Sequence, residues 1–348
     1  MTDTAADAGR PPTGDDERDL AAARAGDHAA FERLVAPHRP ALHAHCYRLL
    51  GSVHDADDAV QDALVGAWRG LGGFEGRSSL RTWLYRIATN AATRVGRRRS
   101  PRVLAIDHAP PRTDVDDLGA PVTEAVFVEP WPGDVPDLAD EGDPAGRYDR
   151  RESVELAFVA ALQTLPATQR AVVVLRDVLA IPATEVADTL DTTPTAVNSA
   201  LQRARATLGA RLGDTRQQTT LRALGDEGQR RLVDGLVRAW ERRDLDALVG
   251  LLADDVRLTM PPLPAWFSGR DAVRTFFGER MFATPWRLVP TTANAQPALA
   301  CYQGDAEGRF PLSGVVVLGV GAGGVTALDS FLDRAAVAPF ALPPEVAP

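Results

Sequence analysis

The chain has 348 residues, of which 45% are hydrophobic and 24% charged, and its formal net charge is −9. This composition excludes a largely disordered chain, and the length suits two or three globular domains. Two distant cysteines, Cys46 and Cys301, exclude a disulfide scaffold and favour the reducing cytoplasm. No apolar run approaches the ~20 residues of a membrane helix, and the polar residues 1–19 contain no signal-peptide core, so we expect no membrane association.

Charge is sorted along the chain. Residues 76–102 contain eight arginines and no acidic residue, whereas residues 103–149 contain twelve acids, two arginines and seven prolines. The basic segment suits a polyanion such as nucleic acid, although the whole chain is acidic. The acidic segment is too polar and proline-rich to bury a core, so we predict a linker over residues 103–150. Two apolar spots in it, residues 125–128 and Trp131, can still dock elsewhere.

The first folded unit is predicted over residues 16–102, after a disordered N-terminus of residues 1–15. It is predicted to be all-helical. A first helix over residues 27–50 is interrupted at its two prolines, Pro37 and Pro40.

Two further helices of this unit follow from apolar spacing at i, i+3, i+4, i+7 and i+8. The first spans residues 56–68 and the second spans residues 80–91, with Ser78 or Ser79 as its cap. On the second helix, the same spacing predicts that Leu80, Trp83, Leu84 and Ile87 are buried. The opposite, exposed stripe then consists of Arg81, Tyr85, Thr89 and Thr93, flanked by Arg86 and Asn90.

That exposed stripe has the chemistry of a nucleic-acid surface. Arginines neutralise phosphates, tyrosine stacks on an unpaired base, and asparagine reads a base edge. A solvated helix face is the alternative, but a segment with eight arginines and no acid favours contact with nucleic acid.

A second helical unit is predicted over residues 151–213. A short helix over residues 185–190 is followed by a turn at Asp191 and Thr192. Thr193 and Pro194 then open a longer helix, as a cap residue and a first-turn proline do. This order is a helix-turn-helix. A short polar connector over residues 214–225 leads onward.

The third unit, over residues 226–335, is predicted to be α+β, with a tail over residues 336–348. Helices are expected at residues 232–240 and 272–277, strands at residues 256–260, 286–290 and 298–302, and a hairpin at residues 314–320 and 325–331 around the glycine-rich turn 321–324.

The first two units together resemble sigma-70 family factors of the extracytoplasmic-function type. The resemblance rests on DADDAVQD at residues 55–62, on Ala67-Trp68, and on the run from Phe74 to Asn90. In the second unit it rests on residues 170–212, including the helix-turn-helix. It implies a subunit that binds core RNA polymerase, through the β′ clamp helices and the β subunit, together with promoter DNA.

Site residues follow from that resemblance position by position. The helix that faces core polymerase would carry Asp55, Asp58, Gln61, Asp62 and Trp68. The loop and helix that hold the melted −10 element, with a flipped base in a pocket, would carry Phe74, Arg77, Ser78, Arg81, Tyr85, Arg86 and Asn90. The helix that reads the −35 duplex would carry Thr195, Asn198, Ser199, Gln202, Arg203 and Arg205.

Three positions depart from the family pattern. Asn198 and Ala200 stand where the family often has lysine or arginine, and Pro182 stands where a hydroxyl cap is common. These departures predict modest affinity for the −35 duplex. Trp83 lies on the apolar stripe, so we predict a core position for it and not a base contact.

The third unit resembles the cone-shaped SnoaL-like fold of polyketide cyclases and ketosteroid isomerases. The matching stretches begin at Ala239, Leu251, Met260 and Gly269. The resemblance implies an apolar interior, open to a small apolar ligand or to a docked linker segment such as residues 127–131. Its candidate lining residues are Trp240, Trp266, Phe267, Phe276, Trp286 and Phe331.

No catalytic residue, cofactor or metal site is predicted. Proton abstraction needs a carboxylate poised in the cone, and the two candidates, Asp329 and Asp246, better suit surface or capping roles. His43, His45 and Cys46 do not share one face and lack further ligands, so packing is the better interpretation.

The expected fold is therefore multidomain: two all-helical sigma domains, the second with a helix-turn-helix, followed by an α+β cone. The expected function is promoter-specific transcription initiation, with the cone regulating the sigma domains in cis. Masking of the DNA-binding face and support of a productive pose are both open, and a dual role is favoured because the resemblance implies a built-in substitute for an anti-sigma partner. One alternative is a one-component regulator with a ligand-sensing cone. Another is a cone-fold isomerase or cyclase with a DNA-binding accessory.

Overall fold

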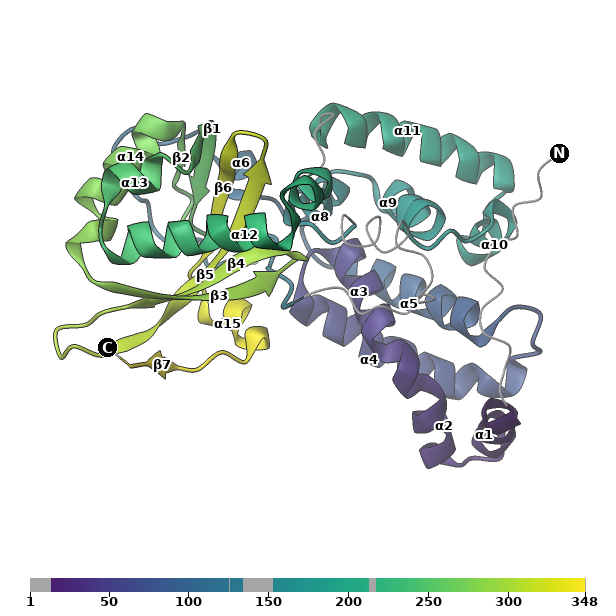
Figure 1. Cartoon of the computed structure of the whole chain (residues 1–348). Helices are drawn as coiled ribbons and strands as arrows, with labels where there is room; N and C mark the ends of the chain where they lie inside the picture. The colour runs from purple at the N-terminus through teal and green to yellow at the C-terminus, as the bar shows by residue number, and fades with distance from the viewer. Residues whose placement is uncertain (1–13, 125, 134–152, 213–216, 348) are drawn as a thin grey trace.

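The computed structural model describes residues 14–124, 126–133, 153–212 and 217–347. The predicted disordered N-terminus and residues 134–150 of the predicted linker lie almost entirely outside this part of the chain. Figure 1 shows two helical domains on one side and a sheet wrapped by helices on the other. We refer to them as the first helical domain, the second helical domain and the cone domain.

The first helical domain has the helices that apolar spacing predicts. They are α1 (Gly14–Arg24), α2 (His28–Val35), η1 (Ala36–His38), α3 (Arg39–Leu50), α4 (Val53–Gly70), η2 (Leu71–Gly73) and α5 (Leu80–Gly96). The predicted interruption at Pro37 is confirmed as the single turn η1, while Pro40 lies in the first turn of α3. Of the two candidate caps, Ser79 caps α5, and its hydroxyl accepts the Thr82 N–H at 3.1 Å.

The second helical domain contains the predicted helix-turn-helix. Its elements are α8 (Leu156–Gln163), α9 (Ala167–Val173), η3 (Val174–Val178), α10 (Ala183–Thr189) and α11 (Pro194–Leu212). The turn passes through Asp191, whose φ of 50° is left-handed. Thr193 accepts the Ala196 N–H at 3.2 Å and so caps α11, as predicted. Pro182 stands before α10 without a side-chain cap.

The cone domain is built on one curved sheet. Its elements are α12 (Gln217–Glu241), α13 (Leu245–Val249), β1 (Leu252–Thr259), β2 (Trp266–Ser268), α14 (Arg270–Glu279), η4 (Met281–Ala283), β3 (Trp286–Ala293), β4 (Gln296–Gln303), β5 (Phe310–Gly321), β6 (Gly324–Phe331), α15 (Arg334–Val337), η5 (Ala338–Phe340) and β7 (Glu345–Val346). The strand order is β2-β1-β6-β5-β4-β3, with β7 added to β5. The predicted hairpin is β5–β6, paired antiparallel.

The ends of the cone domain differ from the predicted boundaries. Residues 217–225 of the predicted connector are part of α12, where Gln218 and Leu221 are buried and only Gly225 interrupts the helical geometry, while residues 214–216 lie outside the described residues. The predicted tail is also structured, because it forms α15, η5 and β7. Among the described residues, no helix is long and apolar enough to cross a membrane.

One hydrophobic core passes through both helical domains, the described linker and one face of the sheet. Its buried members include Leu42, Tyr47, Trp131, Val172, Val315 and Phe331. A second core fills the other face of the sheet under α12 and α14, and it includes Trp240, Phe267, Phe276 and Trp286. Because the first core is shared by all three domains, none of them can leave the others without exposing apolar surface.

The described part of the acidic linker docks on the other domains through the two apolar spots singled out in its sequence, since Phe127, Val128 and Trp131 are buried. Val103 and Phe127 form a parallel bridge, and Pro132 pairs with Ala293 at the end of β3. Val128 and Trp131 are 1% and 5% exposed. The linker buries these few apolar side chains and leaves most of its acidic side chains in solvent. Its average composition therefore does not predict this packing. The segment also contains the short helix α6 (Ala105–His108).

Asn294, in the tight turn between β3 and β4, joins the domains through hydrogen bonds. Its side-chain oxygen accepts the Trp131 N–H at 2.9 Å, and its side-chain amide donates to the Tyr47 hydroxyl at 2.8 Å and to the Val154 carbonyl at 2.7 Å. Its own N–H donates to the Trp131 carbonyl at 2.9 Å. Asn294 is fully buried with φ 54°, a conformation that asparagine tolerates better than most residues.

Candidate functional site

One face of α4 carries an exposed acidic stripe. Asp58, Gln61 and Asp62 are all exposed on it, as their predicted partner surface requires. Val65 continues this face one turn later and is 50% exposed. Val65 is not among the residues predicted to face a partner, although an apolar residue four positions after Gln61 on a polar helix face is a readable signal. Carboxylates around an exposed valine suit a partner with basic groups around an apolar patch.

Trp68 lies at the end of the same helix but packs inside the first helical domain. Its ring stacks on His28 with the centroids 4.1 Å apart and meets the edge of Phe31 at 5.2 Å. Trp68 therefore packs α2 against α4. It stabilises the helix that carries the acidic stripe and is not itself part of the exposed stripe.

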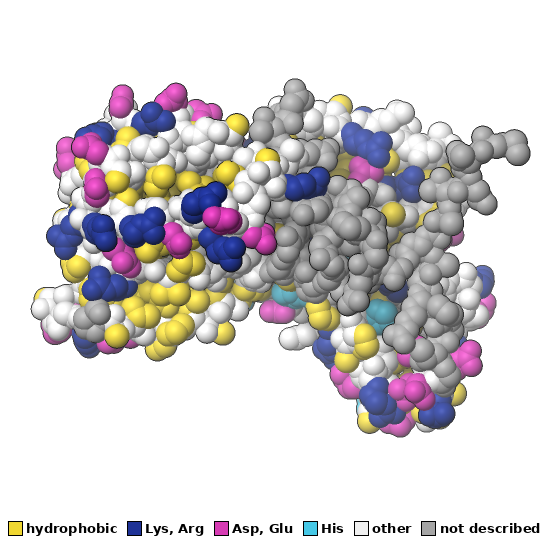
Figure 2. Space-filling model, in the orientation of Figure 1, with side chains coloured by type: hydrophobic (Ala, Val, Ile, Leu, Met, Phe, Trp, Pro, Cys, Tyr) yellow, Lys and Arg dark blue, Asp and Glu magenta, His cyan; other side chains and the backbone are white. Residues whose placement is uncertain are grey.

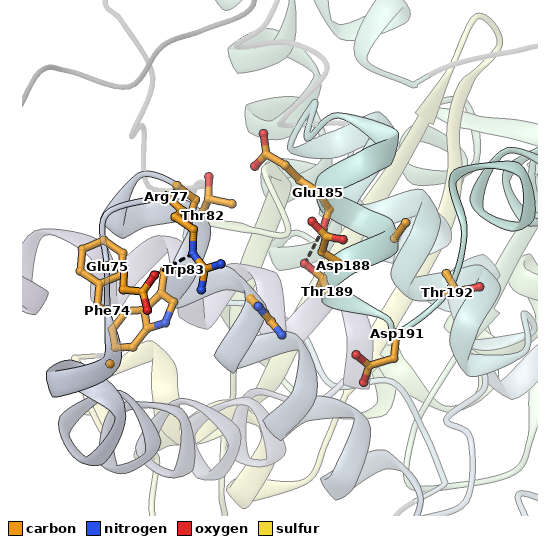
Figure 3. A pocket seen from close by; sticks show the side chains of 14 residues that line it. Phe74, Glu75, Arg77, Thr82, Trp83, Glu185, Asp188, Thr189, Asp191 and Thr192 are labelled. Carbon is orange, nitrogen blue, oxygen red and sulfur yellow. Dashed lines mark hydrogen bonds and ion pairs between the residues drawn. The ribbon is translucent and has the colours of Figure 1, made fainter.

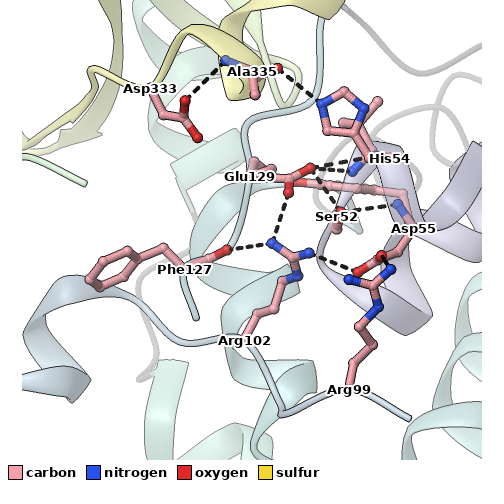
Figure 4. Close-up of polar contacts among 11 residues, drawn as sticks. Ser52, His54, Asp55, Arg99, Arg102, Phe127, Glu129, Asp333 and Ala335 are labelled. Carbon is pink, nitrogen blue, oxygen red and sulfur yellow. Dashed lines mark hydrogen bonds and ion pairs between the residues drawn. The ribbon is translucent and has the colours of Figure 1, made fainter. Parts of the chain in front are cut away.

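Asp55 is buried and belongs to an internal charge network. The guanidinium of Arg102 donates to it at 2.7 Å, and Arg99 lies 3.2 Å away. Arg102 also reaches Glu129 of the linker at 2.8 Å and the Phe127 carbonyl at 3.1 Å. Figure 4 shows these groups converging between α4 and the linker. We therefore assign Asp55 a structural role and leave it out of the exposed stripe.

Glu129 caps the helix that bears the stripe. Its second carboxylate oxygen accepts the Ser52 hydroxyl at 2.8 Å and the Val53 N–H at 2.9 Å. A carboxylate at this end of a helix satisfies free N–H groups and favours the helix dipole. In the same first turn, the His54 ring bonds to the carbonyl of Ala335 in α15 at 3.0 Å. The start of α4 is thus held by both the linker and the cone domain.

The loop before α5 is built on an aromatic pair. Phe74 is 7% exposed and its ring centroid lies 5.0 Å from that of Trp83. The guanidinium of Arg24 donates to the Phe74 carbonyl and fixes the loop to α1. Arg77 projects from the rim and pairs with Glu75 at 3.1 Å, while Ser78 is half-buried.

The predicted faces of α5 are rotated in the structure. Tyr85 is 4% exposed and Thr89 is fully buried, so the expectation that both face solvent is wrong. The cause is α3, because the ring of His45 meets Tyr85 edge-on at 5.1 Å and bonds to Thr89 at 2.9 Å. Trp83, expected in the core, is half-buried at the rim of a cavity.

Two polar residues of α5 are exposed, and a third is half-buried. Arg86 and Asn90 are exposed, and Arg81 is half-buried with its guanidinium 5.7 Å from the centre of the Tyr85 ring. Tyr85 is therefore shielded by Arg81 and offers no free face for a base.

A cavity of about 660 Å³ separates this loop from the helix-turn-helix. Figure 3 shows Arg77 and Trp83 on one side and Glu185, Asp188 and Asp191 on the other. The loop side offers arginine and an aromatic ring, which suit a nucleic-acid strand. The facing wall is acidic and repels phosphate.

The predicted −35 helix, α11, is open to solvent along one side. Thr195, Asn198, Gln202, Arg203 and Arg205 are exposed, and Ser199 is half-buried. Arg205 pairs with Asp177 at 2.6 Å, so part of its charge is already neutralised. Figure 1 shows α11 along the outer edge of the second helical domain, away from the cone domain.

Neither of the two carboxylates considered for cone chemistry lines the cone cavity. Asp329 is buried, so the surface or capping role predicted for it is wrong; it accepts the Thr259 hydroxyl at 2.9 Å, and burial raises its pKa. Asp246 is exposed and pairs with Arg274 at 2.7 Å, as its predicted surface role requires. Phe331, predicted to line the cone, lies in the shared core on the other face of the sheet.

Histidine and cysteine side chains in α3 are used for packing. His43 lies 2.8 Å from Asp57 and 3.2 Å from the Val53 carbonyl. Burial lowers the pKa of His45 to about 3, so it stays neutral and bonds to Thr89. Burial raises the pKa of the Cys46 and Cys301 thiols, which removes the thiolate that a nucleophile needs.

Comparison with known proteins assigns the three domains. Sigma-70 region 2 matches residues 34–102, sigma-70 region 4 matches residues 155–208, and a SnoaL-like domain matches residues 233–333. The chain is 40% identical over 333 residues to the ECF RNA polymerase sigma factor SigG of Mycobacterium tuberculosis, covering 94% of this chain and 86% of the relative. The protein belongs to the extracytoplasmic-function sigma factors.

Two further comparisons show how much of the chain resembles other sigma factors. SigM of M. tuberculosis is 33% identical over 196 residues, which cover 56% of this sigma factor and 83% of SigM. The crystal structure of M. tuberculosis SigJ superposes with a TM-score of 0.55 at 22% identity, covering 88% of this chain and 98% of SigJ. The whole arrangement, with two sigma domains and a SnoaL-like cone, is therefore a known fold.

The buried position of Asp55 gives a stability prediction for this sigma factor. Asp55→Asn removes the charge opposite Arg102 and should lower the free energy of unfolding by about 3 kcal/mol, because it leaves a buried cation short of a partner. The matched variant Asp58→Asn, on the exposed stripe, should change it by less than about 0.5 kcal/mol. Chemical denaturation of the full chain measures both. An Asp55→Asn protein as stable as wild type would contradict the structural role.

Proposed function

We propose that this sigma factor binds core polymerase through the exposed face of α4. The observation that supports this is the stripe of Asp58, Gln61, Asp62 and Val65, held out to solvent on a helix whose N-terminus is fixed by the linker. The loop at Phe74 and the exposed face of α5 then take the melted −10 strand, and α11 takes the −35 duplex. Core polymerase places the site of action in the cytoplasm.

Within the −10 surface, we assign the direct contacts with the DNA strand to Arg77, Arg86 and Asn90. Trp83 replaces Tyr85 as the aromatic group, because its ring lines the cavity while the Tyr85 ring is covered. Phe74 supports Trp83 from below. Aromatic stacking and backbone neutralisation together suit a single strand with an extruded base.

The cone domain regulates these surfaces in cis by holding the sigma domains closed. In the closed arrangement, Glu185, Asp188 and Asp191 face the −10 loop across the cavity. A strand on the loop would bring its phosphates toward this acidic wall, so promoter opening requires the second helical domain to move away. The shared core and the Asn294 bonds oppose that movement. This contact favours inhibition over a productive pose.

The rival functions have less support. A cone-fold isomerase needs a carboxylate in its cavity, and no aspartate or glutamate is among the described residues that line it. A one-component regulator needs no exposed acidic stripe beside a strand-binding loop.

Transcription in vitro tests the proposed function. Purified full-length protein, core polymerase and a genomic promoter library should yield transcripts from a defined subset of promoters that core polymerase alone does not produce. Transcripts that are the same with and without the protein would contradict the proposal.

Charge reversal on α4 should separate polymerase binding from folding. Asp62→Arg should weaken the complex with core polymerase at least tenfold, because it replaces an attraction with a repulsion at an exposed site. Asp234→Arg, an exposed acid on α12, is the control and should bind normally. Titration of labelled protein with core polymerase gives both affinities. Wild-type binding by a folded Asp62→Arg protein would refute the assignment of this face.

The two DNA surfaces should fail in different ways. Arg203→Ala should cost about 1–3 kcal/mol of −35 duplex binding if the arginine reads a guanine with two bonds. Arg205→Ala should cost less, since Asp177 already holds that arginine. Asn90→Ala should instead slow promoter melting, seen as permanganate reactivity of the −10 strand, with duplex binding spared. Equal loss of duplex binding in all three variants would contradict the division of roles.

A further inference from the structure

A cavity of about 250 Å³ lies between the two helical domains. Its walls come from the ends of α3 and α5, from residues 97–102 after α5, and from residues 163–170 of the second helical domain. A water molecule takes up about 30 Å³ in the liquid, so the cavity has room for a ligand of several heavy atoms. None of the residues to which the proposed function assigns polymerase or DNA contacts lines it.

Four arginines and one carboxylate are among the described residues that line this cavity. Arg99 and Arg102 share the carboxylate of Asp55, at 3.2 and 2.7 Å. Arg102 also pairs at 2.8 Å with Glu129, which is not a lining residue. These two cations and two anions balance one another. The excess positive charge of the cavity therefore comes from the other two arginines.

The first of them, Arg170, is a half-buried cation without an acidic partner among the described residues. Its guanidinium donates to the Leu49 carbonyl at 2.6 Å, to the side-chain oxygen of Gln163 at 2.7 Å and to the Leu165 carbonyl at 3.1 Å. These three residues also line the cavity, so the guanidinium lies at its wall. All the acceptors are neutral, and burial lowers the pKa of Arg170 to about 10. The guanidinium is still charged at neutral pH, and an anion in the cavity would supply the missing countercharge.

The second, Arg97, is exposed and makes no side-chain hydrogen bond or ion pair with another described residue. Other arginines lie among acids: on the face of the cone domain in Figure 2, arginine and acidic side chains are mixed, and Arg231 pairs with Glu227 on α12. The free guanidinium of Arg97 can turn toward a ligand without breaking a contact. A guanidinium binds phosphate oxygens through two parallel N–H bonds.

We propose that a small phosphate monoester binds in this cavity between Arg97 and Arg170. Two uncompensated cations suit a dianion, and a phosphate monoester carries nearly two negative charges at neutral pH. Arg97 supplies the hydrogen bonds, while Arg170, whose N–H groups are already used, supplies charge. A phosphodiester of the DNA backbone has one charge per phosphate and matches this excess less well. Because both helical domains line the cavity, the bound ester stabilises the closed arrangement of the two.

A matched pair of anions tests the charge of the ligand. Methyl phosphate and methyl sulfate have nearly the same size and shape, but at pH 8 the first is a dianion and the second a monoanion. Full-length protein at constant ionic strength should bind methyl phosphate about fivefold more tightly, because its second charge meets a second uncompensated guanidinium. Calorimetry without polymerase or DNA gives both dissociation constants, so the result does not depend on sigma activity. Equal affinities, or no saturable binding of methyl phosphate, would overturn the proposal.

Arginine variants locate the binding site. Arg97→Gln should weaken methyl phosphate binding about tenfold, the factor that one hydrogen bond between charged groups provides. Arg98→Gln is the matched control, because Arg98 is also exposed but does not line the cavity, and it should change the affinity less than about twofold. Equal weakening by the two variants would indicate general attraction to a basic surface and would overturn the site. A single-stranded oligonucleotide should not displace methyl phosphate; displacement would assign the cavity to the DNA backbone and overturn the free ester as its ligand.

Hydrogen exchange tests the link between the two helical domains. Gly51, at the end of α3, packs so closely on Gln163 of α8 that a Cβ on it would lie 3.2 Å from that side chain. Saturation with methyl phosphate should slow exchange of the Gly51 and Leu165 amides by several fold and leave the Val273 amide, in α14 of the cone domain, unchanged. Binding that leaves the Gly51 and Leu165 amides unchanged would overturn the stabilisation of the closed arrangement.

Discussion

The buried hydrogen bonds of Asn294 are the constraint on which the arrangement of this sigma factor depends. One side chain in the turn of a cone hairpin binds Tyr47 of region 2, Trp131 of the linker and Val154 at the start of region 4. Each of these groups is buried, so each would lose a partner if the hairpin withdrew, at a cost of about 1–3 kcal/mol per group. The turn therefore specifies one position of the cone against the sigma domains.

This constraint connects regulation to the surfaces that bind partners. Trp131, held by Asn294, follows Glu129 by two residues, and Glu129 caps α4 and pairs with Arg102. A shift of the cone domain is thus transmitted through the linker to the start of the helix that carries the exposed acidic stripe. Leu118, on the same linker, lines the cavity of the cone domain. The described part of the linker is for these reasons an integral part of the packed structure.

Local sequence patterns predicted the helices and the helix-turn-helix. Contacts between residues distant in sequence determine which of the predicted site residues are exposed. Apolar spacing and capping residues specify α4, α5 and the helix-turn-helix, because these are properties of neighbouring residues. The exposed positions of Asp58 and Asp62 followed in the same way. The burial of Tyr85 could not be predicted, because it depends on His45 in a different helix. Asp55 likewise lies on a helix that carries several acidic residues. Its buried position depends on the ion pair with Arg102, which is distant in sequence.

Hydrogen exchange in an Asn294→Gly variant tests the central role of this turn most directly. Glycine keeps the left-handed turn and removes every side-chain bond, and Ala295→Gly, at the neighbouring position with the same φ of 54°, is the control. The Trp131 N–H donates to Asn294 itself, and the Leu156 N–H donates to the side chain of Gln296, next to the turn, at 2.8 Å. We predict that both amides exchange at least tenfold faster in Asn294→Gly. Amides inside α4 should exchange as in wild type, and so should all amides of the Ala295→Gly protein. Unchanged protection of Trp131 and Leu156 in Asn294→Gly would contradict the account.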